Sequence, residues 1–166
     1  MRRRLGAAPK VGFAVITMLA TVASVSGCGL FAQAPKPTPT VTSDAHVKDV
    51  FTLSIGDCLL DPNKAGETST ATTIDCAKPH NSEVYDVFSL ADGAYPGDDE
   101  VRGQSIDGCR KSFKTFIGVA RDDSELNYSY YYPTEHSWTT SDDRAVTCLV
   151  YDPAGRVSGT LANAER

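Results

Sequence analysis

The chain has 166 residues with 16 basic and 21 acidic side chains, which gives a net charge of −5 at pH 7. This acidic balance argues against binding to nucleic acid, whose phosphates are held by clustered lysine and arginine. The length suits one compact domain with short additional segments.

The N-terminal segment is typical of an export signal. Three arginines at residues 2–4 and Lys10 precede an uncharged apolar run over residues 11–25. The run is too short to cross a bilayer as a helix, which needs about 20 apolar residues, and it matches the apolar region of a secretory signal peptide. We therefore expect residues 1–27 to be a signal peptide. Without its four basic residues, the net charge of −5 becomes −9.

The end of the apolar run carries a more specific signal. Val25-Ser26-Gly27-Cys28 resembles the bacterial lipoprotein box, in which an aliphatic residue and two small residues precede an invariable cysteine. The resemblance implies that the Cys28 thiol receives a diacylglycerol and becomes the mature N-terminus. Two or three acyl chains would attach the protein stably to the outer face of the cell membrane without spanning it. The alternative is a plain membrane anchor with an incidental cysteine.

Residues 28–46 are expected to form a tether. Their Pro/Thr-rich run over residues 34–40 has no apolar period, and this composition predicts an extended, partly stiff segment. A recognition peptide or a glycosylated stalk is the alternative interpretation. The globular domain is then expected over residues 47–166.

The first half of the domain predicts short strands. Alternating apolar residues over residues 47–55 favour a half-buried strand that runs into a turn at residues 56–58. Residues 61–73 are polar and typical of a surface loop. A second strand is expected over residues 83–90, where apolar side chains stand among polar ones.

One segment has the pattern of an amphipathic helix. Cys109, Phe113 and Phe116 recur at the i, i+4 and i+7 positions of one helical face. Gly118 stands where a left-handed C-terminal cap is expected. The sequence therefore predicts a helix over residues 99–117, although two glycines weaken its first half by about 1 kcal/mol each relative to alanine.

Strands return towards the C-terminus. Residues 145–151 are the clearest strand in the chain, because apolar side chains occupy both alternating faces and Cys148 lies on one of them. A tyrosine-rich strand is expected before it, over residues 128–132. A hairpin turn at residues 152–155 is expected to lead into a last strand over residues 157–161.

Four cysteines remain if Cys28 carries lipid. In an exported chain they suggest two disulfides, with three possible connectivities. Cys109 and Cys148 lie on apolar faces of the helix and the best strand, which favours a bridge between them, and Cys58 and Cys76 then bracket the polar loop. A zinc site is the competing interpretation, but the chain has no Cys-x-x-Cys pair. We expect no metal and no cofactor.

The elements together predict an α+β fold. We expect a mainly antiparallel sheet of roughly four to six strands, with one principal helix packed across it. Two disulfides would staple the layers and contribute a large share of the stability of so small a core.

A longer pattern of cysteines, aromatic residues and turn residues resembles a known family. Its most specific part is the run Cys76-Ala77-Lys78-Pro79-His80-Asn81-Ser82-Glu83-Val84-Tyr85. The other parts are Gly56-Asp57-Cys58, Tyr95-Pro96-Gly97, Cys109 with Phe113, Tyr132-Pro133, Ser137-Trp138 and Asp143-Arg144-Ala145-Val146-Thr147-Cys148. Over residues 51–161 the chain is similar to the septum-formation domain family of actinobacterial envelope proteins. Asp142 departs from the family pattern, which has glycine there, and this departure bears on the local turn.

The resemblance implies a place and a process. The place is the outer side of the membrane, and the process is cell division or envelope construction. It implies no known reaction.

Four polar residues form a candidate cluster, namely His80, Glu83, Asp143 and Arg144. A histidine with a carboxylate three residues away can serve as general acid and base, which would suit a small envelope hydrolase. We favour a structural interpretation, in which His80 ends a turn, Glu83 pairs with Arg144, and the set orders a loop. The chain has no Gly-x-Ser-x-Gly motif and its 3 histidines lie far apart in the sequence, so no catalytic or metal-binding residue is assigned.

The candidate binding surface is aromatic and comprises Tyr95, Tyr128, Tyr130, Tyr131, Tyr132 and Trp138. Aromatic side chains are frequent binding hot spots, although they can equally fill one side of a thin core, as we expect of Trp138. The sequence thus predicts a non-enzymatic, lipid-anchored envelope protein that binds a protein partner or a wall polymer. The alternatives are the hydrolase that uses His80 and Glu83, and a carrier of an apolar ligand.

Overall fold

The computed structural model describes residues 44–61 and 68–166. The expected signal peptide, the lipidation site Cys28, most of the tether and the middle of the polar loop lie outside these residues. Among the helices of the described part, none combines the length and the apolar character needed to cross a membrane.

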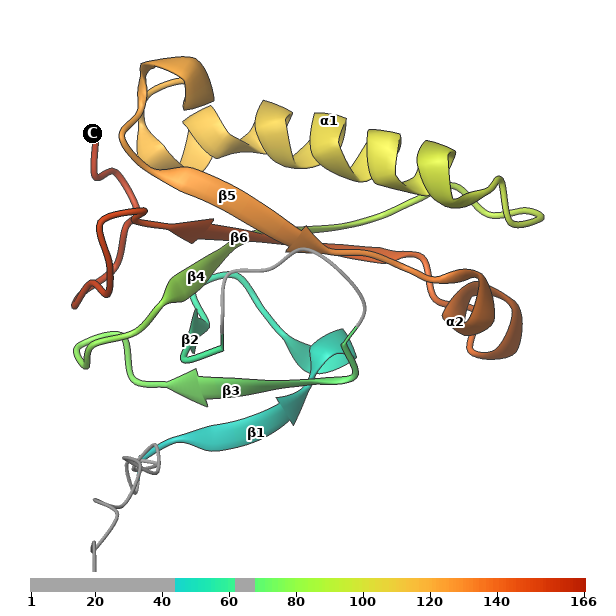
Figure 1. Ribbon diagram of the computed structural model, residues 1–166, viewed down its shortest axis with the longest axis horizontal. Helices are drawn as coiled ribbons and strands as arrows, with labels where there is room; N and C mark the ends of the chain where they lie inside the picture. Colours follow the sequence, from blue (N-terminus) through green and yellow to red (C-terminus); the bar gives the residue numbers. More distant parts are fainter. Residues whose placement is uncertain (1–43, 62–67) are drawn as a thin grey trace, which may run out of the picture. The chain divides into compact units, whose positions relative to one another are not determined.

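A curled six-stranded sheet carries one long helix on one face (Figure 1). The strands are β1 (His46–Asp49), β2 (Cys58–Leu59), β3 (Thr70–Ile74), β4 (Ser82–Ser89), β5 (Asn127–Tyr131) and β6 (Ala145–Tyr151). The helices are α1 (Asp98–Ile117) and α2 (Glu135–Thr140), with short 3-10 turns η1 (Val50–Thr52) and η2 (Arg121–Asp123). The strand order is β1-β3-β2-β4-β6-β5, and every neighbouring pair is antiparallel. The predicted α+β fold is therefore confirmed.

Helix α1 forms where the apolar period predicts it. Its buried residues include Val101, Cys109, Phe113 and Ile117, which follow one another at helical spacing along a single face. Acidic side chains occupy its first turn, where the positive end of the helix dipole favours them. Gly118 caps the C-terminus at φ 98°, in the left-handed region that glycine adopts without strain.

Apolar side chains pack on both faces of the sheet. On the α1 side, Phe113 and Val146 belong to a core in which the rings of Tyr85 and Phe113 meet edge to face at 5.7 Å. On the other side, Leu149 and Tyr131 pack against residues from η1, β2 and β3 in a smaller core. The alternation along β5 and β6 thus serves two cores, because the sheet curls back over its second face.

Both predicted disulfide pairings are confirmed. Cys109–Cys148 joins α1 to β6 through the larger core, and Cys58–Cys76 joins β2 to the turn after β3. Each bridge therefore ties together segments that are distant in the sequence.

Three local predictions are wrong. Residues 51–55 do not continue the first strand, because Asp49 accepts a hydrogen bond from the Phe51 amide and turns the chain into η1. The polar loop ends in β3, whose β-branched threonines suit a strand although they are polar. Residues 157–161 form no strand and contribute only an isolated bridge between Val157 and His80.

The two glycines in the first half of α1 have different surroundings, which predicts opposite effects of alanine. A Cβ at Gly103 would meet no atom within 4 Å, whereas a Cβ at Gly108 would lie 2.2 Å from Cζ of Phe88. We expect Gly103→Ala to raise the free energy of unfolding by up to about 1 kcal/mol through helix propensity. Gly108→Ala should lower it by about 1 kcal/mol because Phe88 must move. Urea unfolding of both variants is the measurement, and equal shifts would contradict a packing role for Gly108.

Candidate functional site

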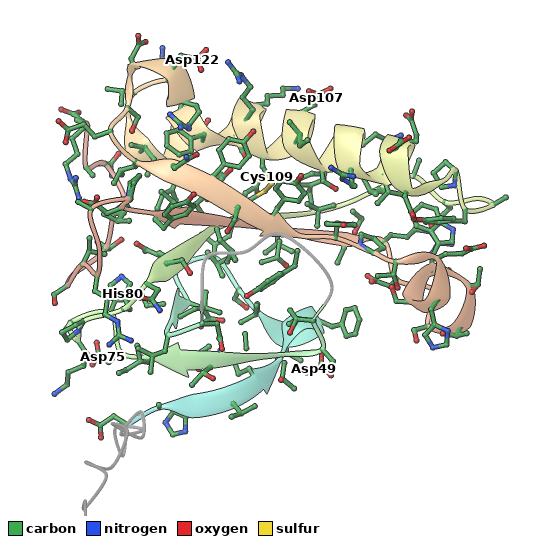
Figure 2. The ribbon with its side chains drawn as sticks, viewed as in Figure 1. Asp49, Asp75, His80, Asp107, Cys109 and Asp122 are labelled. Atoms are coloured by element: carbon green, nitrogen blue, oxygen red, sulfur yellow. A yellow bond between two sulfur atoms is a disulfide. The ribbon has the colours of Figure 1, made fainter. Side chains whose placement is uncertain are left out.

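His80 and Glu83 hold the C-terminal segment against the start of β4. His80 exchanges two backbone hydrogen bonds with Val157, at 2.9 and 3.1 Å, and its ring Nδ1 lies 2.9 Å from the Lys78 carbonyl oxygen (Figure 2). The Glu83 carboxylate accepts hydrogen bonds from the Thr160 hydroxyl and the Leu161 amide, both at 2.6 Å. Both side chains are buried. This arrangement fastens the tail and leaves no carboxylate oxygen of Glu83 without a protein partner.

Asp143 and Arg144 lie at the other end of the β4–β6 pair. In that pair Glu83 is opposite Val150, whereas Ser89 is opposite Ala145, so Glu83 and Arg144 are separated by about 20 Å. The expected pairing of Glu83 with Arg144 is therefore wrong. The cause is the register, which a sequence pattern does not specify.

Arg144 orders the segment around α2. Its guanidinium lies 3.8 Å from the centre of the Trp138 ring, Nη1 donates a hydrogen bond to the Trp138 carbonyl at 3.1 Å, and Nη2 pairs with Asp142 at 3.1 Å. Trp138 in turn donates from Nε1 to the Gly93 carbonyl at 2.9 Å. Asp142 adopts φ 52°, the left-handed conformation that aspartate tolerates better than most residues. The turn thus keeps the geometry that the expected glycine would provide.

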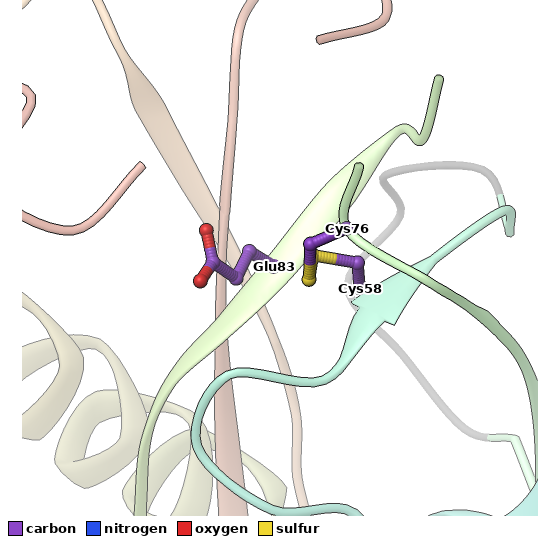
Figure 3. A group of neighbouring side chains, drawn as sticks. All are labelled: Cys58, Cys76 and Glu83. Atoms are coloured by element: carbon purple, nitrogen blue, oxygen red, sulfur yellow. A yellow bond between two sulfur atoms is a disulfide. The ribbon is translucent and has the colours of Figure 1, made fainter. Parts of the chain in front are cut away.

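Three potential metal ligands, Cys58, Cys76 and Glu83, come within 4.8 Å of one another (Figure 3). The two sulfurs are joined in a disulfide, and it is the free thiolate that binds a metal. Glu83 already accepts two hydrogen bonds from the tail. In this oxidised form, the group is a structural bridge beside a buried carboxylate.

The six aromatic residues of the candidate surface lie in different surroundings. Trp138 is buried beneath Arg144, and Tyr131 is buried in the smaller core. Tyr128, Tyr130 and Tyr132 form a row on the α1 side, where successive ring centres are 6.5 and 5.7 Å apart and the rings are partly buried against the larger core.

Tyr95 stands apart from this row. It packs edge to face on Trp138 at 5.6 Å and donates a hydrogen bond to Asp98. Burial first, and the hydrogen bond to Asp98 second, raise the pKa of Tyr95 to about 12. Its main role is therefore to hold the loop before α1.

Two adjoining hollows lie beside α2, and four of the candidate residues line them: Tyr131 and Tyr132 the first, Arg144 the second, and Asp143 both. The first, of about 390 Å³, is lined by η1, the end of β5, α2 and β6, and includes Phe51, Tyr131 and Thr147. The second, of about 590 Å³, extends towards Leu90 and Arg144. Four residues line both hollows, namely Phe51, Ser141, Asp143 and Ala145. We refer to the two hollows together as the α2 groove.

Phe51 is the prominent apolar side chain of the α2 groove. It is 53% exposed, although its neighbour Val50 in η1 is buried in the smaller core. The Asp143 carboxylate in the same groove accepts hydrogen bonds from the Ser137 hydroxyl at 2.8 Å and the Ala145 amide at 2.9 Å. The groove therefore combines a projecting aromatic ring with a polar wall whose geometry is fixed.

Comparison with known proteins identifies the family. No curated protein and no solved structure matches this chain. A family model described as septum formation matches residues 24–148, which is most of the chain and extends through α1, α2 and most of β6. The match confirms the family that the cysteine and aromatic pattern indicates: the chain belongs to the septum formation family.

Proposed function

We propose that this protein is a lipid-anchored, extracytoplasmic binding protein that takes part in septum formation. The family membership supports the process. The two disulfides support a location outside the cytoplasm, because such bonds form and persist in oxidising compartments. The Val25-Ser26-Gly27-Cys28 run supports a lipid anchor at Cys28.

The α2 groove is the observation that carries the binding role. It is open, has an exposed aromatic ring that lines both hollows, and is of a size typical of ligand sites. The hydrolase alternative is less well supported, since His80 and Glu83 are buried under the C-terminal tail, far along β4 from the groove. A carrier of an apolar ligand would need an enclosed cavity, whereas both hollows of this groove are open.

Site-specific photo-crosslinking in the native envelope tests the role. The full chain would carry p-benzoylphenylalanine in place of Phe51 and, as the matched control, in place of Ile55, which is similarly exposed at 57% but lines neither hollow. We expect adducts with division or wall components from position 51 and not from position 55. Identical adducts from both positions, or none from position 51, would contradict the proposal.

Membrane fractionation tests the proposed lipid anchor. Replacing Cys28 by alanine removes the thiol that would carry the lipid. We expect the variant to leave the washed membrane fraction, whereas the wild type stays with it. Equal retention of the two forms would rule out lipid attachment at Cys28.

A further inference from the structure

We propose that the α2 groove binds an uncharged glycan, with one sugar ring in each hollow and Phe51 between them. This inference rests on the proposed function, because it names the ligand class of the same groove. The shape of the groove, its aromatic ring, its hydroxyl groups and its charge each support this ligand class.

The shape of the groove suits an extended ligand of at least two units. Each hollow alone falls within the usual range for small-ligand sites. The hollows adjoin, because they share four lining residues, and Phe51 is one of the four. A ligand that fills both must therefore pass the Phe51 ring, as a chain of rings does.

The Phe51 ring is held outwards by the local backbone. The Asp49 carboxylate accepts a hydrogen bond from the Phe51 amide at 2.9 Å and so fixes the first turn of η1, whose place is marked by Asp49 in Figure 2. Val50 is buried in the same turn, which leaves Phe51 to project from it. A rigidly presented aromatic face is suited to stacking on the C–H face of a sugar, since aromatic side chains combine large contact area with little conformational freedom.

The floor of the first hollow contains hydroxyl groups without partners. Thr147 is only 5% exposed, and among the described residues its hydroxyl has no hydrogen-bond partner. Tyr131 is also buried, lines the same hollow, and has no partner for its hydroxyl within the described ranges. Burial first, and the charge of Asp61 second, raise the pKa of Tyr131, so its hydroxyl remains a proton donor. Neither oxygen is among the buried side-chain atoms that lack a partner in the described part of the chain, so both hydroxyls are accessible from the hollow and can bond to sugar hydroxyls in place of water.

The charge of the groove disfavours anionic ligands. No lysine or arginine is among the described residues that line the first hollow. The second has three aspartates and one arginine, and that arginine is already stacked on Trp138 and paired with Asp142. A neutral, hydroxyl-rich ligand therefore fits better than a phosphate or a carboxylate.

An extended peptide fits this groove less well. Peptides that bind sheets usually add a strand at an exposed edge, where backbone groups are free. Of the two strands that line the first hollow, β6 is paired on both sides, with β4 and with β5, and the edge strand β5 contributes only its last residue, Tyr131. In the groove β6 presents side chains from the face of the sheet, and such side chains are suited to contacts with the hydroxyls of a glycan.

Isothermal titration calorimetry on the full-length protein in detergent tests the inference. The probes are chitin oligosaccharides of one, two and four rings, cellotetraose, maltotetraose, muramidase-solubilised wall glycan, and a neutral tetrapeptide. We expect glycan affinity to rise about tenfold from one ring to two and little beyond. Phe51→Ala should weaken binding by about tenfold and Thr147→Val by about threefold, whereas Ile55→Ala should leave it unchanged.

Three results would overturn the inference: no binding of any glycan probe at millimolar concentration, binding that Phe51→Ala does not weaken, or tighter binding of the tetrapeptide. Thermal unfolding of each variant confirms that it is folded, and Phe51 and Ile55 have similar exposure, so a general effect would appear in both. If adducts still form from position 51 while no glycan binds, the binding role stands and the ligand class is wrong. If glycans bind while position 51 gives no division or wall adducts, the ligand class stands and the proposed role of the groove in binding division or wall components is wrong.

Discussion

Replacing Cys109 and Cys148 together by alanine is expected to lower the free energy of unfolding by about 4 kcal/mol. The disulfide links positions 39 residues apart, so its loss gives the unfolded chain a large loop of additional freedom. Both cysteines are fully buried where α1 crosses β6. Small domains have total stabilities of about 5–15 kcal/mol, so the variant should be marginally folded or unfolded at 37 °C.

The second disulfide provides the matched control. Cys58–Cys76 spans 18 residues, and its removal by a double alanine substitution should lower the free energy of unfolding by about 3 kcal/mol. Urea unfolding of the full-length oxidised protein and both double variants gives the comparison. Removing both cysteines of a pair avoids a free thiol that can form a wrong bridge. A larger loss for the Cys58–Cys76 pair, or no loss for either, would contradict the loop-entropy account.

The fold could be predicted where one physical signal dominates. Cys109 and Phe113 recur at helical spacing, and Cys148 lies within a strand that is apolar on both faces, so the layer-to-layer disulfide follows from the two faces. β3 was harder to detect, because threonine is both polar and β-branched, and its polarity masks its strand preference. The sequence does not predict helix α2, because its segment has no apolar period. The signal that the segment does carry is a reciprocal capping pair of Thr134 and Ser137, with serine in place of the usual Glu or Gln at the second position.

The candidate site depends on tertiary arrangement, which a local pattern does not contain. The distance between Glu83 and Arg144 follows from the β4–β6 register. The sequence pattern places Phe51 in an alternating strand, whereas the Asp49 cap turns it outwards into the groove. The groove itself joins η1, β5, α2 and β6, and their side chains meet only because the sheet curls.

The family-specific run over residues 76–85 contains His80 and Glu83, which hold the C-terminal tail against β4. Loss of this contact is the second change from which we expect a large effect on stability. Glu83→Ala is expected to lower the free energy of unfolding by about 3 kcal/mol, because it leaves the Leu161 amide without its acceptor in a buried position. Leu161 itself belongs to the larger core, so its displacement also removes apolar packing. Glu83→Gln keeps the volume and one acceptor oxygen, and should lower the free energy by about 1 kcal/mol.

Hydrogen exchange separates this fastening role from a catalytic one. In Glu83→Ala the amides of Val157, Gly159 and Leu161, which are hydrogen-bonded to His80, Cys76 and Glu83, should lose protection, whereas those of β6 should keep most of theirs. Because the α2 groove lies towards the other end of the β4–β6 pair, ligand binding there should be unchanged in Glu83→Gln. Retained protection at Leu161 in Glu83→Ala would contradict the fastening role. Loss of groove binding in a fully stable Glu83→Gln would instead place the carboxylate in the functional site, since the amide preserves the fold but not the charge.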